Sequence, residues 1–253
     1  MKTKNIIAAL LLAFFSNVAI AQDITVDEII SNYLENIGGE DAWRKVKTLK
    51  VVGKVNQGGL EIPLEIVSMS DGRQYTKITF QGMNIMQGVY DGESLWSTNF
   101  QSMKAEKADT ETTENFKLSL NDFPDTWLDY KKKGYTAELV GTETIDGTDT
   151  YKVKLTQEPQ VIDGKEVENV TYYYFDTEVF VPLAEDSEVK SGQSAGVVQR
   201  ITYSDYDEVD GLYFPFSLTQ GVKGGASQPI IFSSVEVNPE VDETLFAFPE
   251  SGN

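Results

Sequence analysis

The segment VTYYYFDTEVFVPLAEDSEVKSGQSAGVVQRITYSDYDEVDGLYFPFSL, residues 170–218, contains the same strand pattern twice. Each copy begins with a run of β-branched and aromatic residues, 170–175 in the first and 199–206 in the second. A turn rich in Asp, Glu or Gly follows, and then a second apolar run that is interrupted by Pro182 or by Pro215. This order is typical of adjacent antiparallel strands. Because proline lacks the N–H that a central ladder needs, both prolines predict strand starts, bulges or edges in a sheet that curves without closing.

The second copy also predicts which side of its last strand is buried. Large apolar residues occupy every second position there, namely Leu212, Phe214, Phe216 and Leu218. Because side chains alternate between the two faces of a strand, these four share one face. We therefore predict that this face contacts the core.

The same period of two predicts strands through most of the remaining chain. Asp71-Gly72 and Asp91-Gly92 separate apolar runs, and glycine accepts the positive φ that tight turns require. The chain is thus predicted to be mainly β with a few helices, forming a highly curved antiparallel sheet or unclosed β-barrel. The further predicted strands are residues 48–56, 60–69, 73–80, 84–90, 94–100, 135–143, 150–157 and 228–237.

Residues 25–37 are the clearest predicted helix. Thr25 and Glu28 match the capping box, in which two side chains satisfy backbone N–H groups at a helix start. Apolar residues recur on one face of the segment, and Gly38-Gly39 predicts where it ends. This apolar face is expected to be buried against the strands.

A second helical region interrupts the strand pattern between residues 105 and 133. Its large apolar residues recur at steps of four and three, which is the spacing of a helix face. Because Pro124 cannot lie inside a continuous helix without a kink, two short helices are predicted, with Pro124 in the first turn of the second. The residues with this spacing are Phe116, Leu120, Phe123, Trp127 and Tyr130.

The first 21 residues have the pattern of a secretory signal peptide. A basic start precedes an apolar run at residues 6–15, and Ala19-Ile20-Ala21 fits a small-x-small cleavage site. Cleavage after Ala21 leaves residues 22–253 as one expected domain, since no Pro/Ser-rich linker divides them. Gln22 rather than Cys follows the site, so we expect a periplasmic protein that is exported without a lipid anchor.

The composition excludes several partners and several kinds of chemistry. The formal net charge of −19 repels phosphate backbones and anionic headgroups, so binding to nucleic acid or to an anionic membrane is not expected. The chain contains no His and no Cys, which excludes Ser-His-Asp and Cys-His catalysis and zinc sites built on those ligands. No catalytic residue, metal or cofactor is therefore predicted.

Carboxylates leave two minor alternatives, because the chain has 40 acidic residues. A pair of carboxylates could catalyse glycoside hydrolysis, although the sequence singles out no pair. Asp146 with Asp149, and Asp205 with Asp207, could offer oxygen ligands to calcium. These residues lie in or beside predicted turns, where Asp commonly bonds to its own backbone.

Short motifs are spread along the chain in a characteristic order. They are VDEII (26–30) with Gly38-Gly39, VYDG (89–92) with Trp96, LDYK (128–131) with Gly134 and ELVG (138–141), YFD (174–176) with Pro182-Leu183, DY (205–206) with DGLYFP (210–215), and VNP (237–239) with Phe246 and Pro249. In this order the chain resembles the LolA/LolB-like superfamily of periplasmic lipoprotein carriers. Within it, the resemblance is greatest to the exported group known as outer membrane lipoprotein-sorting proteins.

The resemblance implies an unclosed barrel whose helices form a lid over an apolar cavity, which in the carriers takes up lipoprotein acyl chains. The alternative is that the same apolar residues fill a dry core. The expected cavity residues are Phe116, Leu120, Phe123 and Trp127 on the lid, with Trp96 on the sheet side.

The expected function is that of a monomeric, non-enzymatic protein that binds a lipoprotein acyl chain or another lipid-like ligand. Its expected partners are sorting proteins of the outer or inner membrane. The alternatives are a structural or interaction module with a filled barrel, an integral outer-membrane barrel and a carboxylate hydrolase. The carriers also use an arginine to tie the lid to the barrel, and the sequence alone matches none of Arg44, Arg73 and Arg200 to that position.

Overall fold

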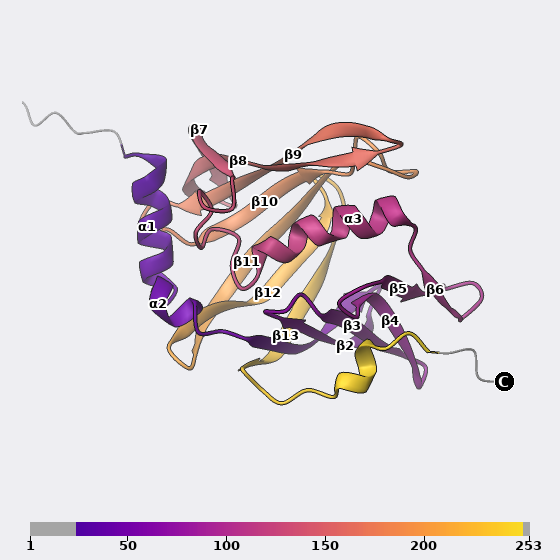
Figure 1. Cartoon of the computed structure of the whole chain (residues 1–253). Coiled ribbons are helices and arrows are strands. Elements are labelled where there is room, and N and C mark those ends of the chain that lie inside the picture. Colours follow the sequence, from indigo (N-terminus) through magenta and orange to yellow (C-terminus); the bar gives the residue numbers. More distant parts are fainter. Residues whose placement is uncertain (1–23, 250–253) are drawn as a thin grey trace, which may run out of the picture.

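The computed structural model describes residues 24–249, so the predicted signal peptide and its cleavage site lie outside the described part. Thirteen strands form one antiparallel sheet in the order β6-β5-β4-β3-β2-β1-β13-β12-β11-β10-β9-β8-β7 (Figure 1), which confirms the predicted fold class. No helix within residues 24–249 is long and apolar enough to cross a membrane. The elements are α1 (Val26–Asn36), α2 (Glu40–Trp43), β1 (Thr48–Gln57), β2 (Leu60–Met69), β3 (Gln74–Phe80), β4 (Met83–Tyr90), β5 (Leu95–Thr98), β6 (Ala105–Lys107), α3 (Thr110–Ser119), η1 (Leu120–Asp122), β7 (Thr136–Ile145), β8 (Thr148–Ile162), β9 (Lys165–Asp176), β10 (Pro182–Glu188), β11 (Val198–Val209), β12 (Leu212–Val222), β13 (Ser227–Val237) and η2 (Glu243–Phe246).

The sheet consists of two meanders that meet where β1 pairs with β13. Leu49 lies opposite Val237 at this junction, and Val51 lies opposite Val235. The edge strands β6 and β7 stand at opposite ends of the strand order, so the described sheet is unclosed. Figure 1 shows β1–β5 and β7–β10 facing each other, with α3 in the opening between them. We call the side of the sheet that faces α3 the concave face.

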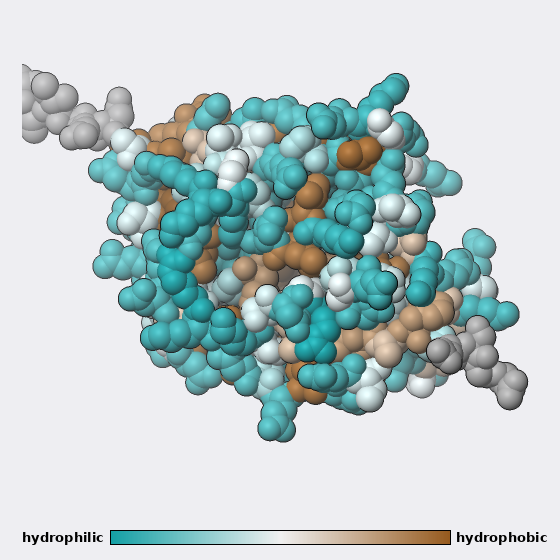
Figure 2. All heavy atoms as spheres, in the orientation of Figure 1, coloured by the Kyte–Doolittle hydropathy of each residue, from teal (hydrophilic) through white to brown (hydrophobic). Residues whose placement is uncertain are grey.

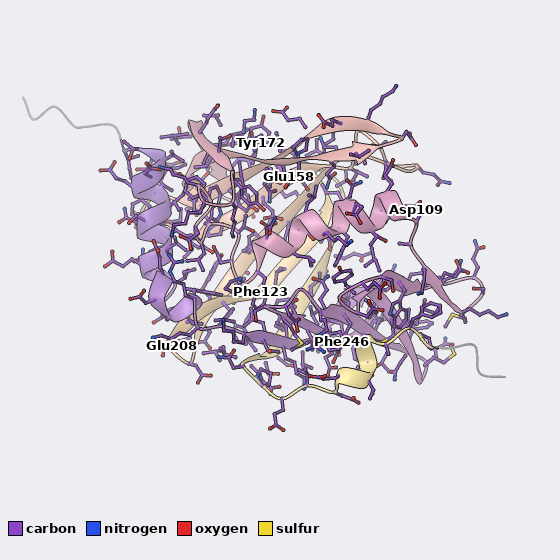
Figure 3. The ribbon with its side chains drawn as sticks, in the orientation of Figure 1. Asp109, Phe123, Glu158, Tyr172, Glu208 and Phe246 are labelled. Carbon is purple, nitrogen blue, oxygen red and sulfur yellow. The ribbon has the colours of Figure 1, made fainter. Side chains whose placement is uncertain are left out.

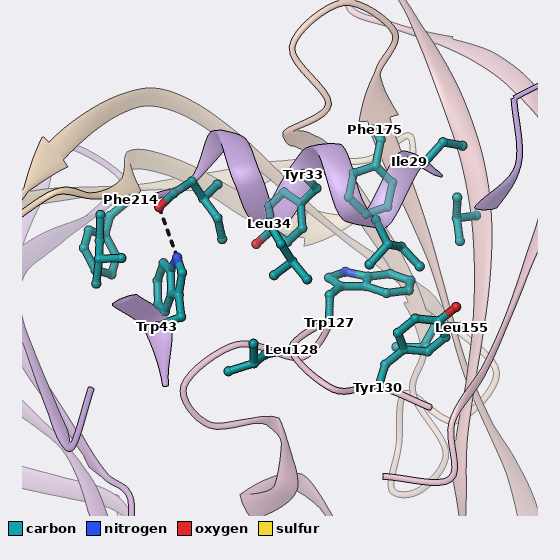
Figure 4. Close-up of a cluster of buried hydrophobic side chains, with 14 of the residues drawn as sticks. Ile29, Tyr33, Leu34, Trp43, Trp127, Leu128, Tyr130, Leu155, Phe175 and Phe214 are labelled. Carbon is teal, nitrogen blue, oxygen red and sulfur yellow. Dashed lines mark hydrogen bonds between the residues drawn. The ribbon is translucent and has the colours of Figure 1, made fainter. Parts of the chain in front are cut away.

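The main core fills the end of the sheet that α1 covers. α1 begins with the predicted capping box, in which Thr25 and Glu28 bond reciprocally through side chain and backbone. On its apolar face, the Tyr33 ring lies edge-on to Phe175, with centroids 5.5 Å apart. Trp127 also packs edge-on against Phe175, at 5.4 Å (Figure 4). The helix is therefore anchored to the sheet by the contact of Tyr33 with Phe175, and the segment that follows η1 packs against the same Phe175 ring.

A second, smaller core lies on the side of β2–β5 away from α3 (Figure 1). Val67, Tyr75, Val89 and Trp96 are buried there with Phe246 of η2. The indole N–H of Trp96 donates a hydrogen bond of 3.0 Å to the carbonyl oxygen of Phe246. The C-terminal part of the described chain thus covers the convex face of the first meander.

The two prolines of residues 170–218 occupy positions that a sheet tolerates. Pro182 is the first residue of β10, and the β9–β10 register shifts directly after it. Pro215 lies in β12 before Ser217, where the pairing with β13 begins. Its missing N–H therefore interrupts no part of the β12–β13 ladder. Both placements agree with the prediction.

The prediction of a second mid-chain helix, with Pro124 in its first turn, is wrong. α3 and η1 form the first helical segment, but residues 123–134 are a series of turns. The Asp125 carboxylate accepts hydrogen bonds from the backbone N–H groups of Trp127 and Leu128, at 2.8 and 3.2 Å. Asp129 then adopts a φ of 57°, in the left-handed region that a right-handed helix excludes. The apolar spacing is real, but these local bonds replace the helix.

Candidate functional site

A row of half-buried apolar side chains crosses the concave face. Ile62, Val55, Ile230 and Leu218 lie directly opposite one another on β2, β1, β13 and β12. Directly opposed residues of antiparallel strands project from the same face of the sheet. Leu218 is two positions from Phe216, which packs against the main core, so that face is the concave one. We call these four residues the apolar row.

In the shared orientation of Figures 1 and 2, α3 lies in front of the sheet, so the concave face is turned towards the viewer. Figure 2 shows hydrophobic side chains at the centre of this view, inside a rim of hydrophilic ones. When a hydrophobic molecule covers apolar side chains that are partly exposed in this way, apolar surface leaves water and the free energy falls. The face is therefore suited to bind an apolar ligand.

α3 lies over the concave face without burying any of its own side chains fully. The Glu111 carboxylate accepts hydrogen bonds from the backbone N–H groups of Asp163 and Gly164, each at 2.9 Å. Asn115 donates to the carbonyl oxygen of Val161 at 2.6 Å and accepts from its N–H at 2.8 Å. These contacts between α3 and the end of β8 and the β8–β9 turn are thus polar and solvent-exposed.

Apolar contacts attach the helical segment to the opposite half of the sheet. The rings of Phe116 and Tyr90 on β4 lie 5.3 Å apart. Leu120 lies against Gly72, where a Cβ atom would come within 3.0 Å of the leucine Cδ1. α3 and η1 therefore bridge the two halves of the sheet.

Two hollows lie beneath this bridge. One, of about 250 Å³, lies between α3 and β8–β10, and most of its lining is polar, including Asn115, Gln157 and Asn169. The other, of about 230 Å³, lies beneath η1 and includes Leu120 and Phe123 in its lining. The space beneath α3 and η1 is therefore divided into a mainly polar hollow and one whose lining is mixed, with Ser68, Gln74 and Asp122 beside Leu120 and Phe123, whereas the resemblance implied one apolar cavity.

Two half-buried carboxylates hold the turns that follow η1. Burial raises the pKa of Asp125, although the Tyr33 hydroxyl, which donates at 2.6 Å, acts in the opposite direction. Burial likewise raises the pKa of Asp122, which accepts hydrogen bonds from Gln157 at 3.0 Å and from the Tyr135 hydroxyl at 3.0 Å. Both carboxylates accept hydrogen bonds from neutral donors, so the role of Asp122 and Asp125 is to hold the turns after η1 in position.

The structure separates the five residues that the sequence assigned to one cavity. Trp127 is 2% exposed in the main core, and Phe123 packs against that core. Phe116 and Leu120 lie on the helical bridge, and Leu120 shares the hollow beneath η1 with Phe123. The structure does not place Trp96 on the sheet side of this cavity.

Trp96 projects from the opposite face of the sheet because of its place in the β4–β5 register. It pairs with Val89, and both side chains are buried in the second core. Sequence reasoning also missed the apolar row as a site. The alternating apolar residues of its strands were visible, but only the register brings Ile62, Ile230 and Leu218 into line.

The arginines hold other parts of the fold together. Arg44 of α2 binds Asp129 in the turns after η1. Arg73 lies 3.4 Å from Glu243 of η2, and Arg200 forms an ion pair inside the second meander. Among the contacts of residues 24–249, none of the three arginines forms an ion pair with α3.

Two solved structures are similar to the chain over almost their whole lengths. A DUF1329 family protein from Desulfovibrio piger matches with a TM-score of 0.53 and 16% identity, covering 88% of this chain and 97% of that one. A LolA superfamily protein from Nitrosomonas europaea matches with a TM-score of 0.51 and 14% identity, covering 88% of this chain and 98% of that one. A search of curated proteins finds no match.

An unclosed antiparallel half-barrel with a helix in its opening is the fold of the LolA superfamily, and the resemblance seen in the sequence is confirmed at this level. A family model whose description reads "-like: Uncharacterized protein" matches residues 111–248. The match covers more than half of the 253 residues, so the chain belongs to this family. The matched region includes α3 from its second residue onwards, η1 and the whole second meander.

Proposed function

We propose that the protein is a non-catalytic carrier that shelters a lipoprotein acyl chain, or another lipid-like chain, on the concave face beside α3. The observation that supports this most is the apolar row, whose aligned side chains remain partly exposed on the inner side of the sheet. Covering such a surface with a hydrocarbon chain stabilises the complex by roughly 0.8 kcal/mol per buried CH₂. Because α3 meets the β8–β9 turn through polar contacts, it serves as the lid that opens for loading.

The location and partners of the carrier form part of the same proposal. Cleavage after Ala21 would deliver residues 22–253 to the periplasm as one half-barrel domain. The protein would work as a monomer and exchange its ligand with sorting proteins of the inner or outer membrane. The LolA-like fold supports this setting.

A structural or interaction module with a filled barrel is the alternative function. The burial of Trp127 in the main core and the packing of Phe123 against it favour this alternative, since both were expected to face a ligand. Calorimetric titration with dodecyl maltoside, a neutral alkyl glycoside used below its critical micelle concentration, distinguishes the two. The carrier binds the alkyl chain with measurable heat and a negative heat-capacity change, whereas a filled module gives a flat titration.

Substituting Ile230→Asp is expected to weaken dodecyl maltoside binding by about tenfold or more, because the bound chain would desolvate a carboxylate. Ile230 lies in the middle of the apolar row. The matched control is Ile231→Asp, one position along the same strand, where the side chain is 40% exposed. Calorimetry should show little change for this control. Equal affinities in both variants and the parent protein would show that the ligand lies elsewhere.

Substituting Glu111→Ala is expected to raise the dissociation rate of bound ligand roughly three- to tenfold, because two hydrogen bonds to a charged acceptor are lost and solvent screens part of their effect. These bonds join α3 to the turn at Asp163 and Gly164. Stopped-flow release of a fluorescent fatty-acid analogue measures the rate. The control is Glu114→Ala, because the one ion pair of Glu114 within residues 24–249 is with Lys117 of its own helix. A rate unchanged by Glu111→Ala would contradict the role of α3 as a lid.

A further inference from the structure

A small pocket lies beside the apolar row, at the end of the concave face nearest α1. Its volume is about 180 Å³. Tyrosine side chains and two carboxylates dominate its wall, namely Tyr33, Tyr173, Tyr203, Tyr206, Asp125 and Glu185. We call it the tyrosine pocket. Its lining residues come from α1, from the turns after η1 and from β9 to β12.

The register of the sheet connects the tyrosine pocket directly to the apolar row. Tyr203 of β11 lies opposite Leu218, and Leu218 lies opposite Ile230. These side chains project from the same face of adjacent strands. A chain that lay along the row would therefore place its end at Tyr203.

The two carboxylates of the pocket differ in how their charge is compensated. Asp125 accepts hydrogen bonds from the Tyr33 hydroxyl and from backbone N–H groups, and Lys133 lies nearby, donating to its carbonyl oxygen at 2.9 Å. Glu185 forms no ion pair among the described residues, and no Lys or Arg lines the pocket.

The groups around Glu185 favour the arrival of a positive charge. Burial raises the pKa of Glu185, the hydroxyls of Tyr203 and Tyr173 lower it, and the nearby carboxylates of Asp122 and Asp186 raise it further. The charge of Asp186 is already matched by Arg200 and Lys223 on the other face of β10. A half-buried carboxylate without a cation has lost part of its hydration without gaining a counter-charge, and a bound cation offsets that loss.

The electron-rich faces of tyrosine rings add a second attraction for cations. Ammonium groups bind over aromatic faces, and quaternary ammonium groups are commonly held in cages of such rings. Trp127 also lines the pocket, and its buried indole N–H has no hydrogen-bond partner among the described residues.

We propose that the tyrosine pocket binds an amine or quaternary ammonium group, as the head of a cationic amphiphile whose hydrocarbon chain lies along the apolar row. This inference rests on the proposed function for the chain but assigns a separate site for the head. Glu185 supplies the opposite charge, and Tyr173, Tyr203 and Tyr206 supply the aromatic walls. The neighbouring apolar row supplies affinity for the chain.

The experiment compares three amphiphiles with the same dodecyl chain by calorimetry below their critical micelle concentrations. They are dodecyltrimethylammonium, neutral dodecyl maltoside and anionic laurate. The parent protein should bind dodecyltrimethylammonium about tenfold more tightly than dodecyl maltoside, and laurate most weakly. The preference should persist in high salt, because a buried pair is screened much less than the acidic surface.

The variant Glu185→Gln should abolish the preference for the cation and leave the affinity for dodecyl maltoside unchanged. Its matched control is Glu188→Gln, which removes the same formal charge from an exposed position on the same strand. That control should keep the preference. A second variant, Tyr203→Leu, removes an aromatic wall and should reduce the preference several-fold. Circular dichroism checks that each variant is folded.

The outcomes separate this inference from the proposed function. If all three amphiphiles bind equally, or if Glu185→Gln and Tyr203→Leu both keep the preference, the cation site is overturned while the carrier function stands. If no dodecyl chain binds, the carrier function fails. Tetramethylammonium then tests the pocket alone: binding that Glu185→Gln abolishes supports the site, and an absence of binding overturns it.

Discussion

Replacing Trp127 with Ala is expected to lower the free energy of unfolding by about 3–5 kcal/mol, because the change leaves a large cavity in the main core. Trp127 is 2% exposed. Its ring lies 5.0 Å from Tyr173, 5.4 Å from Phe175 and 5.8 Å from Tyr130, in each case near edge-on (Figure 4). The side chain therefore joins the turns after η1 to β9 and to α1.

Two further variants distinguish a core tryptophan from one that faces a ligand. Trp127→Phe should cost clearly less than Trp127→Ala, because an aromatic ring remains and the indole N–H that is lost bonds to no group in the described part of the chain. Phe116→Ala, on the half-buried face of α3, should lower the free energy of unfolding by about 1–2 kcal/mol. The loss is smaller because the Phe116 ring is partly exposed to solvent in the folded protein. Urea unfolding followed by circular dichroism measures all three. Similar small losses at both positions would place Trp127 outside the core.

Substituting Asp186→Asn is expected to lower the free energy of unfolding by about 3 kcal/mol, because it removes one partner of a buried ion pair. Asp186 is 3% exposed and is contacted by several side chains; it pairs with Tyr172 of β9, which is labelled in Figure 3. Arg200 donates to its two oxygens at 2.6 and 2.7 Å, and Lys223 lies 2.8 Å away. The Tyr174 hydroxyl donates to Oδ2 at 2.6 Å. Without the carboxylate, Arg200 on β11 and Lys223 directly after β12 lose this counter-charge.

The same contacts predict how stability depends on pH. The hydrogen bonds from Arg200, Lys223 and Tyr174 outweigh burial and lower the pKa of Asp186 from 3.8 to about 2. Because the folded state favours the ionised form, this stabilisation is present above pH 4 and is lost as the pH falls from about 4 towards about 2. Urea midpoints measured across this range should fall less steeply for Asp186→Asn than for the parent protein. Glu188→Gln, at an exposed position of the same strand, should keep the parent slope, and equal slopes in all three proteins would contradict the assignment.

Local signals predicted the positions of most strands and the first helix. The capping box of Thr25 and Glu28 and the strand start at Pro182 were both found where the sequence placed them, because each depends on bonds within a few residues. The helix expected after Pro124 does not form, and the cause is again a set of hydrogen bonds within a few residues. The apolar residues have helical spacing, but the Asp125 carboxylate accepts hydrogen bonds from backbone N–H groups, and the backbone at Asp129 has a positive φ that a right-handed helix excludes.

The candidate site could be predicted only in part. Aromatic residues near Phe116 were correctly assigned to a helical segment over the sheet, and Leu120 and Phe123 do border a hollow beneath it. Trp96 and Trp127 look equivalent to these in sequence but lie in two separate cores. Apolarity shows that a side chain tends to be buried, and it does not show which of two faces of a curved sheet buries it.

The amino-acid sequence by itself determined an antiparallel β meander, its turns, its capped first helix and its likeness to the LolA superfamily. These depend on alternation, glycine and proline geometry and short-range hydrogen bonds. Only the tertiary structure decided that Ile62, Val55, Ile230 and Leu218 form one row, and that Tyr203 and Glu185 meet beside it. The physical reason is that these neighbours are set by the pairing of β1 with β13 and by the curvature of the whole sheet, which bring together residues far apart in the chain.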